Sequence, residues 1–230
     1  MQIKRNSFSF FLITCSLLLV SGGIALLYVQ INPISNRSGG NIVFQLVSFT
    51  IYLSYTLKIL SSSSKFTLNL LIKSTPIVFL VIFCILSVFW SIEPGTSIRR
   101  SLALLLTTSF SFYIAIWAKG YYEFVKVFLN VCLITALLAI VAAAIPGLGY
   151  DSSHILHSES LRGLTGQKND LARYMALGII LSFTAIYLNP TKKTYYLCSA
   201  LFLTCVLLLT TSKTPLSILI AMILVLPILN

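Results

Sequence analysis

The chain has 230 residues, of which 57% are hydrophobic and 9% are charged. Because soluble globular proteins carry roughly 25% charged residues, this composition excludes a soluble protein. The net charge of +11 would favour nucleic-acid binding in a soluble chain, but the cations here lie in short connections between apolar runs, where Lys and Arg orient helices in a bilayer. We therefore expect a polytopic membrane protein that contacts membrane lipids and binds no nucleic acid.

Apolar runs long enough to cross a bilayer recur along the whole sequence. A transmembrane helix needs about 20 mostly apolar residues, which predicts an all-α transmembrane bundle of about eight spans. The predicted spans are residues 8–30, 42–60, 74–92, 101–118, 124–145, 171–189, 195–211 and 214–229. In this interpretation residues 1–230 form a single transmembrane domain, and residues 146–170 form an extracytoplasmic loop. No small-residue cleavage pattern follows the first run, so we expect an uncleaved span rather than a signal peptide.

The distribution of Lys and Arg favours a cytoplasmic N-terminus. With this orientation nine cations lie inside, namely Lys4, Arg5, Lys58, Lys65, Lys73, Lys119, Lys126, Lys192 and Lys193. Seven lie outside, namely Arg37, Arg99, Arg100, Arg162, Lys168, Arg173 and Lys213. Arginine is thus concentrated outside, and its guanidinium group binds phosphate or carboxylate through paired hydrogen bonds. Arginines placed against the positive-inside trend indicate an anionic ligand at the outer face, such as a lipid-linked pyrophosphate.

The connection between the third and fourth predicted spans ends in Arg99 and Arg100. We interpret this connection as a phosphate clamp, with Glu93 holding one of the arginines in place and Ser97 capping the fourth span. The open alternative is an ordinary outer loop whose two arginines extend toward water.

Residues 162–172 place charge, glycine and amide groups between two hydrophobic spans, which makes them the most informative segment of the chain. Arg162 and Lys168 flank Gly163 and Gly166, so a ligand could approach the backbone closely while two cations face it. The segment therefore predicts an anion-binding site in the longest loop.

The helix that follows this segment is expected to begin near Leu171. Gln167 and Asn169 add amide groups in front of it, and Asn169 or Asp170 is expected to cap it. Arg173 lies one turn further along. Because a charged side chain that faces lipid costs roughly 2.5 kcal/mol or more, we expect Arg173 to face a cavity, a partner or the membrane interface.

The long loop also holds both histidines, His154 and His157, close to Asp151 and Glu159. No third ligand stands at a recognisable spacing, and two loop histidines are more often solvated than catalytic. We therefore expect no metal and no cofactor, and the residues assign no catalytic base.

Residues 211–215, which read Thr-Ser-Lys-Thr-Pro, join the last two predicted spans and place Lys213 on the outer side. A tight turn explains them. The alternative is that their hydroxyl groups and Lys213 line the same outer cavity as Arg162.

Three of these elements together resemble a known protein family. They are the tryptophan-serine loop ending in Arg99-Arg100-Ser101, the sequence Arg-Gly-Leu-Thr-Gly-Gln-Lys-Asn at residues 162–169, and the turn at residues 211–215. In their order and their placement between spans they resemble the O-antigen ligase and exopolysaccharide polymerase family of bacterial inner-membrane proteins, over residues 80–220.

The resemblance implies a multi-pass protein of the bacterial inner (cytoplasmic) membrane that transfers a glycan at the periplasmic face without a metal. The donor would be a glycan on undecaprenyl pyrophosphate, and the acceptor a glycan or a lipid, in lipopolysaccharide or exopolysaccharide biosynthesis. Arg162 matches a family arginine that holds the donor pyrophosphate. Lys168, Arg99 and Arg100 would support it by position. The further supporting residues would be Gly163, Gly166, Gln167, Asn169, Arg173 and Lys213.

The sequence departs from this family in one respect. Family members have more spans and a large later periplasmic loop with a histidine proposed as the catalytic base, and neither His154 nor His157 matches that position. We therefore expect a chain that lacks the C-terminal part of the family fold, with a second polypeptide as one source of the missing half.

Two other functions stay open at this point. A membrane transporter or flippase for a lipid-linked or small anionic substrate could also present outer arginines, but it should hold polar or broken-helix sites near the middle of the bilayer. A non-catalytic membrane subunit or remnant is the third interpretation.

Overall fold

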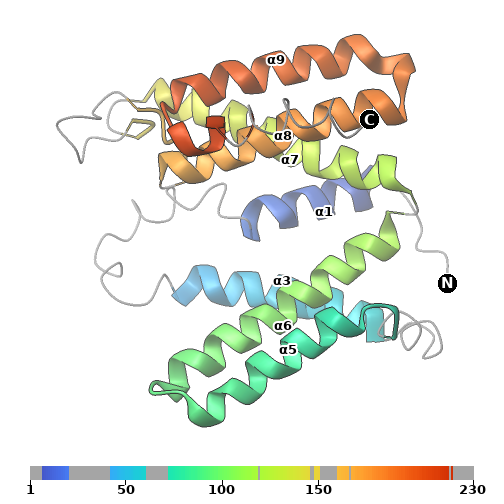
Figure 1. The fold of residues 1–230 in the computed structure, drawn as a ribbon, viewed down its shortest axis with the longest axis vertical. Helices are drawn as coiled ribbons and strands as arrows, with labels where there is room; N and C mark the ends of the chain where they lie inside the picture. Colours follow the sequence, from blue (N-terminus) through green and yellow to red (C-terminus); the bar gives the residue numbers. More distant parts are fainter. Residues whose placement is uncertain are drawn as a thin grey trace. The chain divides into compact units, whose positions relative to one another are not determined.

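The computed structural model describes residues 7–20, 42–60, 72–118, 120–145, 148–150, 160–165, 167–217 and 219. Helices are the regular elements of this part of the chain, and one isolated antiparallel bridge joins Tyr150 and Leu161. The predicted all-α class is confirmed (Figure 1).

The described helices follow the predicted apolar runs closely. In chain order they are α1 (Ser7–Val20), α3 (Ile42–Leu60), α5 (Thr75–Leu86), the short 3-10 helix η2 (Ser87–Trp90), α6 (Pro94–Trp117), α7 (Tyr121–Ala143), α8 (Lys168–Leu188), the 3-10 helix η3 (Pro190–Lys192) and α9 (Lys193–Leu209). Residues 21–30 of the first predicted span and 220–229 of the last lie outside the described residues.

Four helices of the described chain are long and apolar enough to cross a membrane, namely α6, α7, α8 and η3 together with α9. Three shorter apolar helices cover Ser9–Leu19, Leu46–Ile59 and Thr75–Trp90. Large apolar side chains also face outward, among them Phe79 and Leu201, each 69% exposed. Exposed apolar surface of this kind is typical of membrane contact, so the architecture is that of a membrane-embedded protein. The number of spans and their orientation stay predictions.

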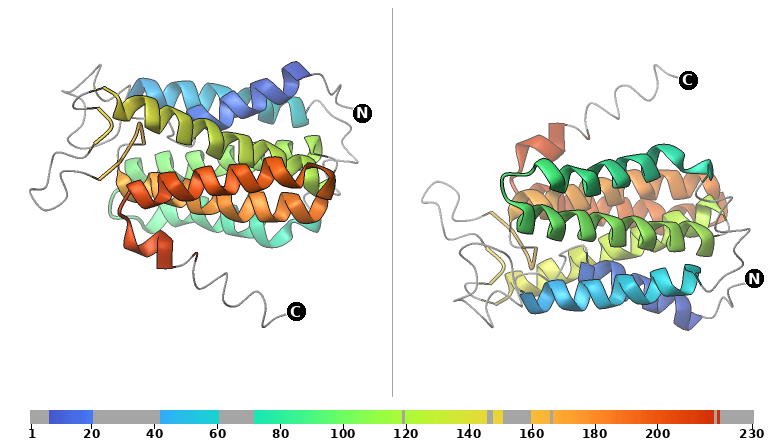
Figure 2. Two further views of the ribbon diagram at one scale, coloured as in Figure 1. Left: turned by 90° about the horizontal axis from the view of Figure 1, so that it is seen from above. Right: turned by 90° about the horizontal axis from the view of Figure 1, so that it is seen from below.

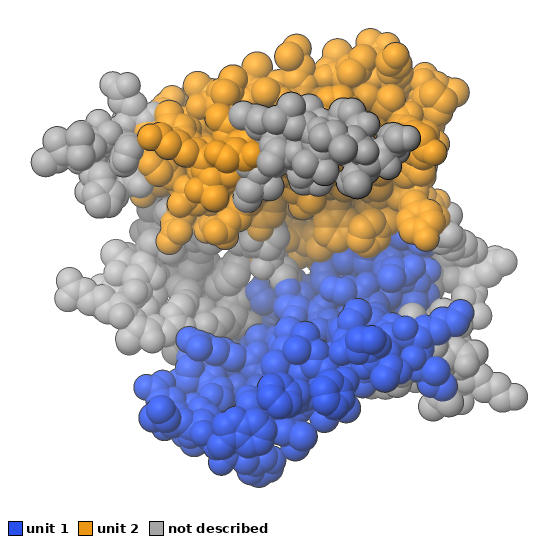
Figure 3. Space-filling model, viewed as in Figure 1, with its two compact units in different colours: residues 1–4, 39–119 blue, residues 5–38, 120–230 orange. Residues whose placement is uncertain are grey.

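The chain divides into two compact units, which Figure 3 shows in different colours. Unit 1 consists of residues 1–4 and 39–119, and unit 2 consists of residues 5–38 and 120–230. Each unit is described by itself, and the expectation of a single transmembrane domain stays a prediction.

In unit 1, α6 packs against α3 and α5. The ring centroid of Tyr55 lies 4.9 Å from that of Phe110 and 4.6 Å from that of Tyr113, which joins α3 to α6. The Ser101 hydroxyl donates a hydrogen bond to the Cys84 carbonyl over 2.8 Å and joins α6 to α5. Aromatic pairs contribute about 0.5–1.5 kcal/mol beyond their burial, so this small cluster fixes how the helices of unit 1 meet.

In unit 2, α8 packs against α7 and α9, and α1 packs against α7. The three helices α7, α8 and α9 lie side by side in the views of Figure 1 and Figure 2. Gly178 allows the close approach, because a Cβ atom there would lie 2.7 Å from Leu203 Cδ1 and 2.8 Å from Cys132 Cβ. The buried side chains of this core include Leu129, Ala136, Ala139, Leu171, Met175 and Ile179. Small residues at a helix contact are the usual means of tight packing in membranes.

Candidate functional site

Helix α8 begins at Lys168, with Gln167 in an extended conformation as its N-cap residue. The expectation that Asn169 or Asp170 caps a helix beginning near Leu171 is therefore wrong. The helix starts earlier because the Gln167 carbonyl already accepts hydrogen bonds from the amides of Asp170 and Leu171, at 3.2 and 3.3 Å. As a result the side chains of Asn169 and Asp170 are available for contacts outside the helix backbone.

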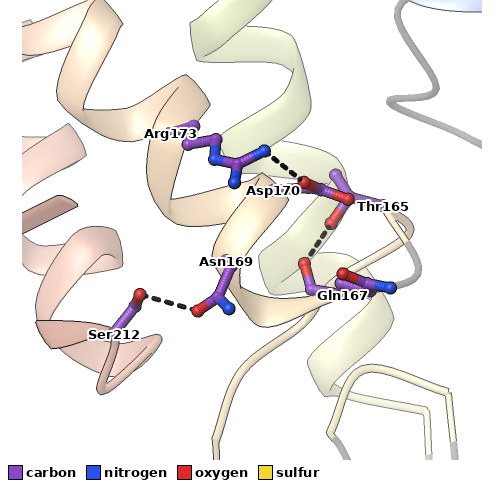
Figure 4. Close-up of polar contacts among 6 residues, drawn as sticks. All are labelled: Thr165, Gln167, Asn169, Asp170, Arg173 and Ser212. Atoms are coloured by element: carbon purple, nitrogen blue, oxygen red, sulfur yellow. Dashed lines mark hydrogen bonds and ion pairs between the residues drawn. The ribbon is translucent and has the colours of Figure 1, made fainter. Parts of the chain in front are cut away.

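A hydroxyl group orders the turn in front of α8. Thr165 Oγ1 donates to the Arg162 carbonyl at 2.8 Å and to the Gln167 carbonyl at 3.0 Å, the second of which Figure 4 shows. Arg162 is thereby tied to the beginning of α8 through its own carbonyl.

Backbone hydrogen bonds also tie Arg162 to the end of α7 and of α9. The amides of Arg162 and Gly163 donate to the Gly149 carbonyl at 2.9 and 3.0 Å, and the Leu161 amide donates to the Leu209 carbonyl at 3.1 Å. The Arg162 side chain is half-buried, and its Nε atom is shielded from solvent. The segment that carries Arg162 is thus held between two helix ends of unit 2.

Gly163 is buried and has a φ of +59°, in the left-handed region. A Cβ atom at this position would lie 2.6 Å from the Cβ atom of Ala139 in α7. The glycine is therefore required by packing on α7 and by its backbone angle. Its contact with a ligand stays a prediction.

A cavity of about 360 Å³ lies beside the first half of α8. Its described lining consists of Asn169, Arg173, Ala176, Leu177 and Ile180 from α8 together with Thr214 and Pro215. The α8 residues recur at helical spacing and occupy one face of the helix. The cavity combines an apolar wall with an amide, a hydroxyl and a guanidinium group, which are the contacts that an amphipathic ligand with an anionic head requires.

One hydrogen bond joins α8 to the turn that follows α9. Ser212 Oγ donates to Asn169 Oδ1 over 2.9 Å, across 43 residues of sequence (Figure 4). The turn also contains Thr211, a non-glycine residue with a φ of +51°. Two of the three predicted motif elements, residues 162–169 and 211–215, therefore meet at the same end of unit 2.

The cations of this end differ in their positions. Arg173 lines the cavity and is paired with Asp170, with Nη1 and Oδ1 3.2 Å apart. Their side chains are 74% and 41% exposed, and exposed pairs of this type contribute only about 0–1 kcal/mol. Arg173 therefore lines a cavity, and its position relative to lipid stays a prediction. Lys168 is half-buried and Lys213 is exposed, and both lie beside the described lining residues rather than among them.

Arg99 and Arg100 are exposed on α6 in unit 1. Helix α6 begins at Pro94 with Glu93 as its N-cap residue, so the expectation that Ser97 caps a span beginning near residue 101 is wrong. A proline at the first position favours this earlier start, because its missing N–H would have no partner there anyway. Ser97 instead forms a 2.6 Å hydrogen bond with Ser91.

Glu93 accepts a hydrogen bond from Thr96 over 3.0 Å. Its expected hold on Arg99 or Arg100 stays a prediction. The expectation that Arg99 and Arg100 support the donor site of Arg162 also stays a prediction, since they belong to unit 1 and Arg162 to unit 2.

Several predicted site residues lie outside the described residues. They are Gly166, His154, His157, Asp151 and Glu159. Within the part of the chain that the structure covers, no group of three His, Cys, Asp or Glu side chains could hold a metal ion.

The sequence did not identify the cavity walls. Ala176, Leu177 and Ile180 are apolar residues of an apolar helix, and only their spacing of three, four and seven from Arg173 marks them as one face. Comparisons of this chain with family models, with curated proteins and with solved structures find no match.

Proposed function

We propose that this chain binds the pyrophosphate of an undecaprenyl-linked glycan donor and takes part in transferring the glycan to an acceptor at the periplasmic face of the bacterial inner membrane. The activity would be that of an O-antigen ligase or polysaccharide polymerase. Its basis is the sequence resemblance, together with the cavity beside α8 that brings two of the resembling elements to one end of unit 2.

The cavity beside α8 is the observation that carries this proposal. A polyprenyl pyrophosphate has a long apolar chain and a doubly charged head. The wall formed by Ala176, Leu177 and Ile180 suits the chain, and the guanidinium group of Arg173 suits the head. Arg162, three residues before Thr165, would hold the pyrophosphate from the adjoining turn.

The proposal includes about eight spans and a cytoplasmic N-terminus. It places the end of unit 2 that holds Arg162, Lys168, Arg173 and Lys213 in the periplasm. The lysines at the other ends of α7 and α8 would then face the cytoplasm, in agreement with the positive-inside rule. The catalytic base is not assigned, and a second polypeptide is one source for it.

A transporter is supported less well by the helices of unit 2. The buried hydroxyl groups of Thr135, Ser182 and Ser199 donate to carbonyls one turn earlier in their own helices, at 2.8, 2.8 and 2.9 Å. These groups are therefore engaged within continuous helices, where a transporter would require polar groups directed at a substrate.

Replacement of Arg162 by Ala tests the proposal. In the purified chain reconstituted in lipid nanodiscs, we expect Arg162→Ala to weaken binding of undecaprenyl pyrophosphate about 10- to 100-fold, because a hydrogen bond to a charged group contributes about 1.5–3 kcal/mol. Arg162→Lys should bind undecaprenyl pyrophosphate with an affinity between those of the wild type and Arg162→Ala, since the charge persists while the bidentate geometry is lost.

Lys193→Ala is the control, because Lys193 is an exposed cation at the opposite end of α8 and α9. Binding of the donor by Arg162→Ala at the wild-type affinity would contradict the proposal. Glycan transfer from a labelled donor is measured in the same samples. Donor binding without transfer would assign the chemical step to another polypeptide.

A further inference from the structure

A second cavity lies at the opposite end of unit 2, where α7 begins and α8 connects to α9. Its volume is about 340 Å³, within the range of about 300–1,000 Å³ that is typical of small-ligand sites. Its described lining consists of Tyr122, Lys126, Leu129, Asn130, Lys192, Tyr195 and Tyr196. None of these residues belongs to the candidate donor site.

The charge of this cavity is positive. Lys126 and Lys192 come from different elements, α7 and η3, and both side chains are exposed. The described lining contains no acidic side chain. Lys126 is also positioned by α1, because its Nζ atom lies 5.3 Å from the ring centroid of Phe10. Two cations that converge on one cavity favour an anionic ligand.

Aromatic rings and an amide form the rest of the cavity. Tyr196 is buried, and its hydroxyl lies 2.8 Å from that of Tyr122, which joins α9 to α7. Tyr195 packs edge-on against Tyr196 with centroids 5.2 Å apart. Asn130 contributes two N–H donors. The cavity therefore offers fixed apolar walls and neutral donors beside its two cations.

The length of α8 separates the two cavities by about the thickness of a bilayer core. Its 21 residues rise about 1.5 Å each, or about 31 Å, which matches a bilayer core of about 30 Å. Asn169 lies at the beginning of α8, whereas Lys192 follows its end. Tyrosines and lysines at a helix end are typical of the headgroup region, so in a bilayer spanned by α8 the second cavity would lie at the depth of lipid phosphates.

We propose that this cavity binds the phosphate-bearing headgroup of an anionic membrane lipid, of the phosphatidylglycerol class, from the leaflet opposite the donor site. Basic pockets between helices at the cytoplasmic surface are suited to such headgroups. Lys126 and Lys192 contact the phosphate oxygens, and Asn130 contacts the polar alcohol of the headgroup. The rings of Tyr122 and Tyr195 and the side chain of Leu129 contact the glycerol backbone and the first carbons of the acyl chains.

A free phosphate ester shares the charge of this ligand but not its apolar part. It would use the two lysines and leave the aromatic wall without contact. For this reason the structure favours a lipid over a soluble anion.

The test is a titration of the purified full chain in neutral detergent, followed by native mass spectrometry. Three probes are compared: short-chain phosphatidylglycerol, phosphatidylcholine with the same acyl chains, and glycerol 3-phosphate. We expect wild-type protein to bind phosphatidylglycerol at least about tenfold more tightly than either of the other two, which corresponds to ~1.4 kcal/mol or more.

The decisive variant is Lys126→Ala/Lys192→Ala. We expect it to bind phosphatidylglycerol about 30-fold more weakly than wild type, which corresponds to ~2 kcal/mol for two lysines, and to bind phosphatidylcholine unchanged. The matched control is Lys73→Ala/Lys193→Ala, which removes the same charge from two exposed lysines outside the cavity and should keep the preference.

Three results would overturn the proposal. One is the absence of a preference for phosphatidylglycerol in wild-type protein, which requires no variant to fold. Another is an equal loss of phosphatidylglycerol affinity in both double alanine variants, which would indicate general attraction by net charge. The third is binding of glycerol 3-phosphate as tightly as the lipid, which would identify a soluble ligand. Lys126→Arg/Lys192→Arg retains both positive charges and should keep the preference for phosphatidylglycerol. It therefore distinguishes a loss of charge from a failure to fold when these two positions are substituted.

Discussion

Gly163 combines two conditions that together exclude any other residue without strain. Its backbone angle lies in the left-handed region, and the space where a side chain would begin is occupied by Ala139. In the sequence the glycine suggested only close approach to a ligand. The structure adds a reason within the fold, because the turn that carries Arg162 can lie on α7 only if this position has no Cβ atom.

We expect Gly163→Ala to lower the free energy of unfolding by about 2–5 kcal/mol. The left-handed conformation contributes about 1–2 kcal/mol to this loss and the crowding against Ala139 about 1–3 kcal/mol. In Gly163→Ala/Ala139→Gly the crowding is relieved and part of the loss should be recovered. The measurement is denaturant-induced unfolding of the purified protein in mixed micelles.

Gly120→Ala is the matched control for this experiment. No atom lies within 4 Å of the position that its Cβ would take, and its φ of −150° is accessible to alanine. If Gly163→Ala and Gly120→Ala have the same free energy of unfolding, the contact with Ala139 does not determine the position of the turn.

Individual site residues were only partly predictable from the sequence. The expectation that Arg173 avoids lipid stays a prediction; it rests on the cost of a charged side chain in lipid, and the structure adds that Arg173 lines a cavity. The contact between Ser212 and Asn169 was not predictable, because any of three hydroxyl groups in residues 211–215 could have faced α8. In the sequence, Lys126 and Lys192 indicated only the orientation of the spans. The structure shows that both line one cavity.

At the scale of the elements, apolar runs located the helices but not all of their beginnings. α6 and α8 each start before the predicted span, at Pro94 and Lys168. A span predicted from hydropathy begins only after the last polar residue in front of it. The helix itself includes such polar residues wherever the backbone hydrogen bonds continue. The bounds of α3, in contrast, agree with the predicted residues 42–60.

Packing between α7, α8 and α9 leads to a second prediction on stability. Gly178→Ala should lower the free energy of unfolding by up to about 2 kcal/mol, because overpacking at Leu203 and Cys132 costs about 1–3 kcal/mol while alanine regains about 1 kcal/mol of helix propensity. The loss should be smaller when Gly178→Ala is made in a Leu203→Ala background.

Gly95→Ala in α6 serves as the control, since nothing lies within 4 Å of the position that its Cβ would take and the helix should gain or keep stability. Unfolding of the paired variants in mixed micelles provides the comparison. Stabilisation by Gly178→Ala would show that α8 does not approach α7 and α9 as closely as the structure indicates.

At the scale of the whole molecule, the sequence predicted helices and membrane but not their grouping. α1 packs with α7 across about a hundred residues of sequence, whereas α6 and α7 are neighbours in the chain and belong to different units. Hydropathy cannot reveal such partners, because lipid and helix surfaces are equally apolar. Helices in a membrane select each other by shape and small residues, as Gly178 illustrates.

The two ends of unit 2 should be accessible from opposite sides of the membrane. In a variant whose five native cysteines are replaced by alanine, Thr211→Cys should react with a membrane-impermeant maleimide on intact spheroplasts. Thr191→Cys should react only after the membrane is permeabilised. Both positions are exposed and lie at opposite ends of α9. Reaction of both cysteines in intact spheroplasts would contradict the proposed orientation, and detergent-solubilised protein controls for intrinsic reactivity.

The length of α9 determines both its span and the position of the Leu209 carbonyl, which accepts a hydrogen bond from the Leu161 amide. A helix that only spans lipid can absorb an extra residue by tilting. In α9, one inserted residue would turn the Leu209 carbonyl by about 100° and carry it away from Leu161. The register of the last helix turn is thereby transmitted to the backbone beside Arg162, so an insertion far along α9 would disturb the candidate donor site without contacting it.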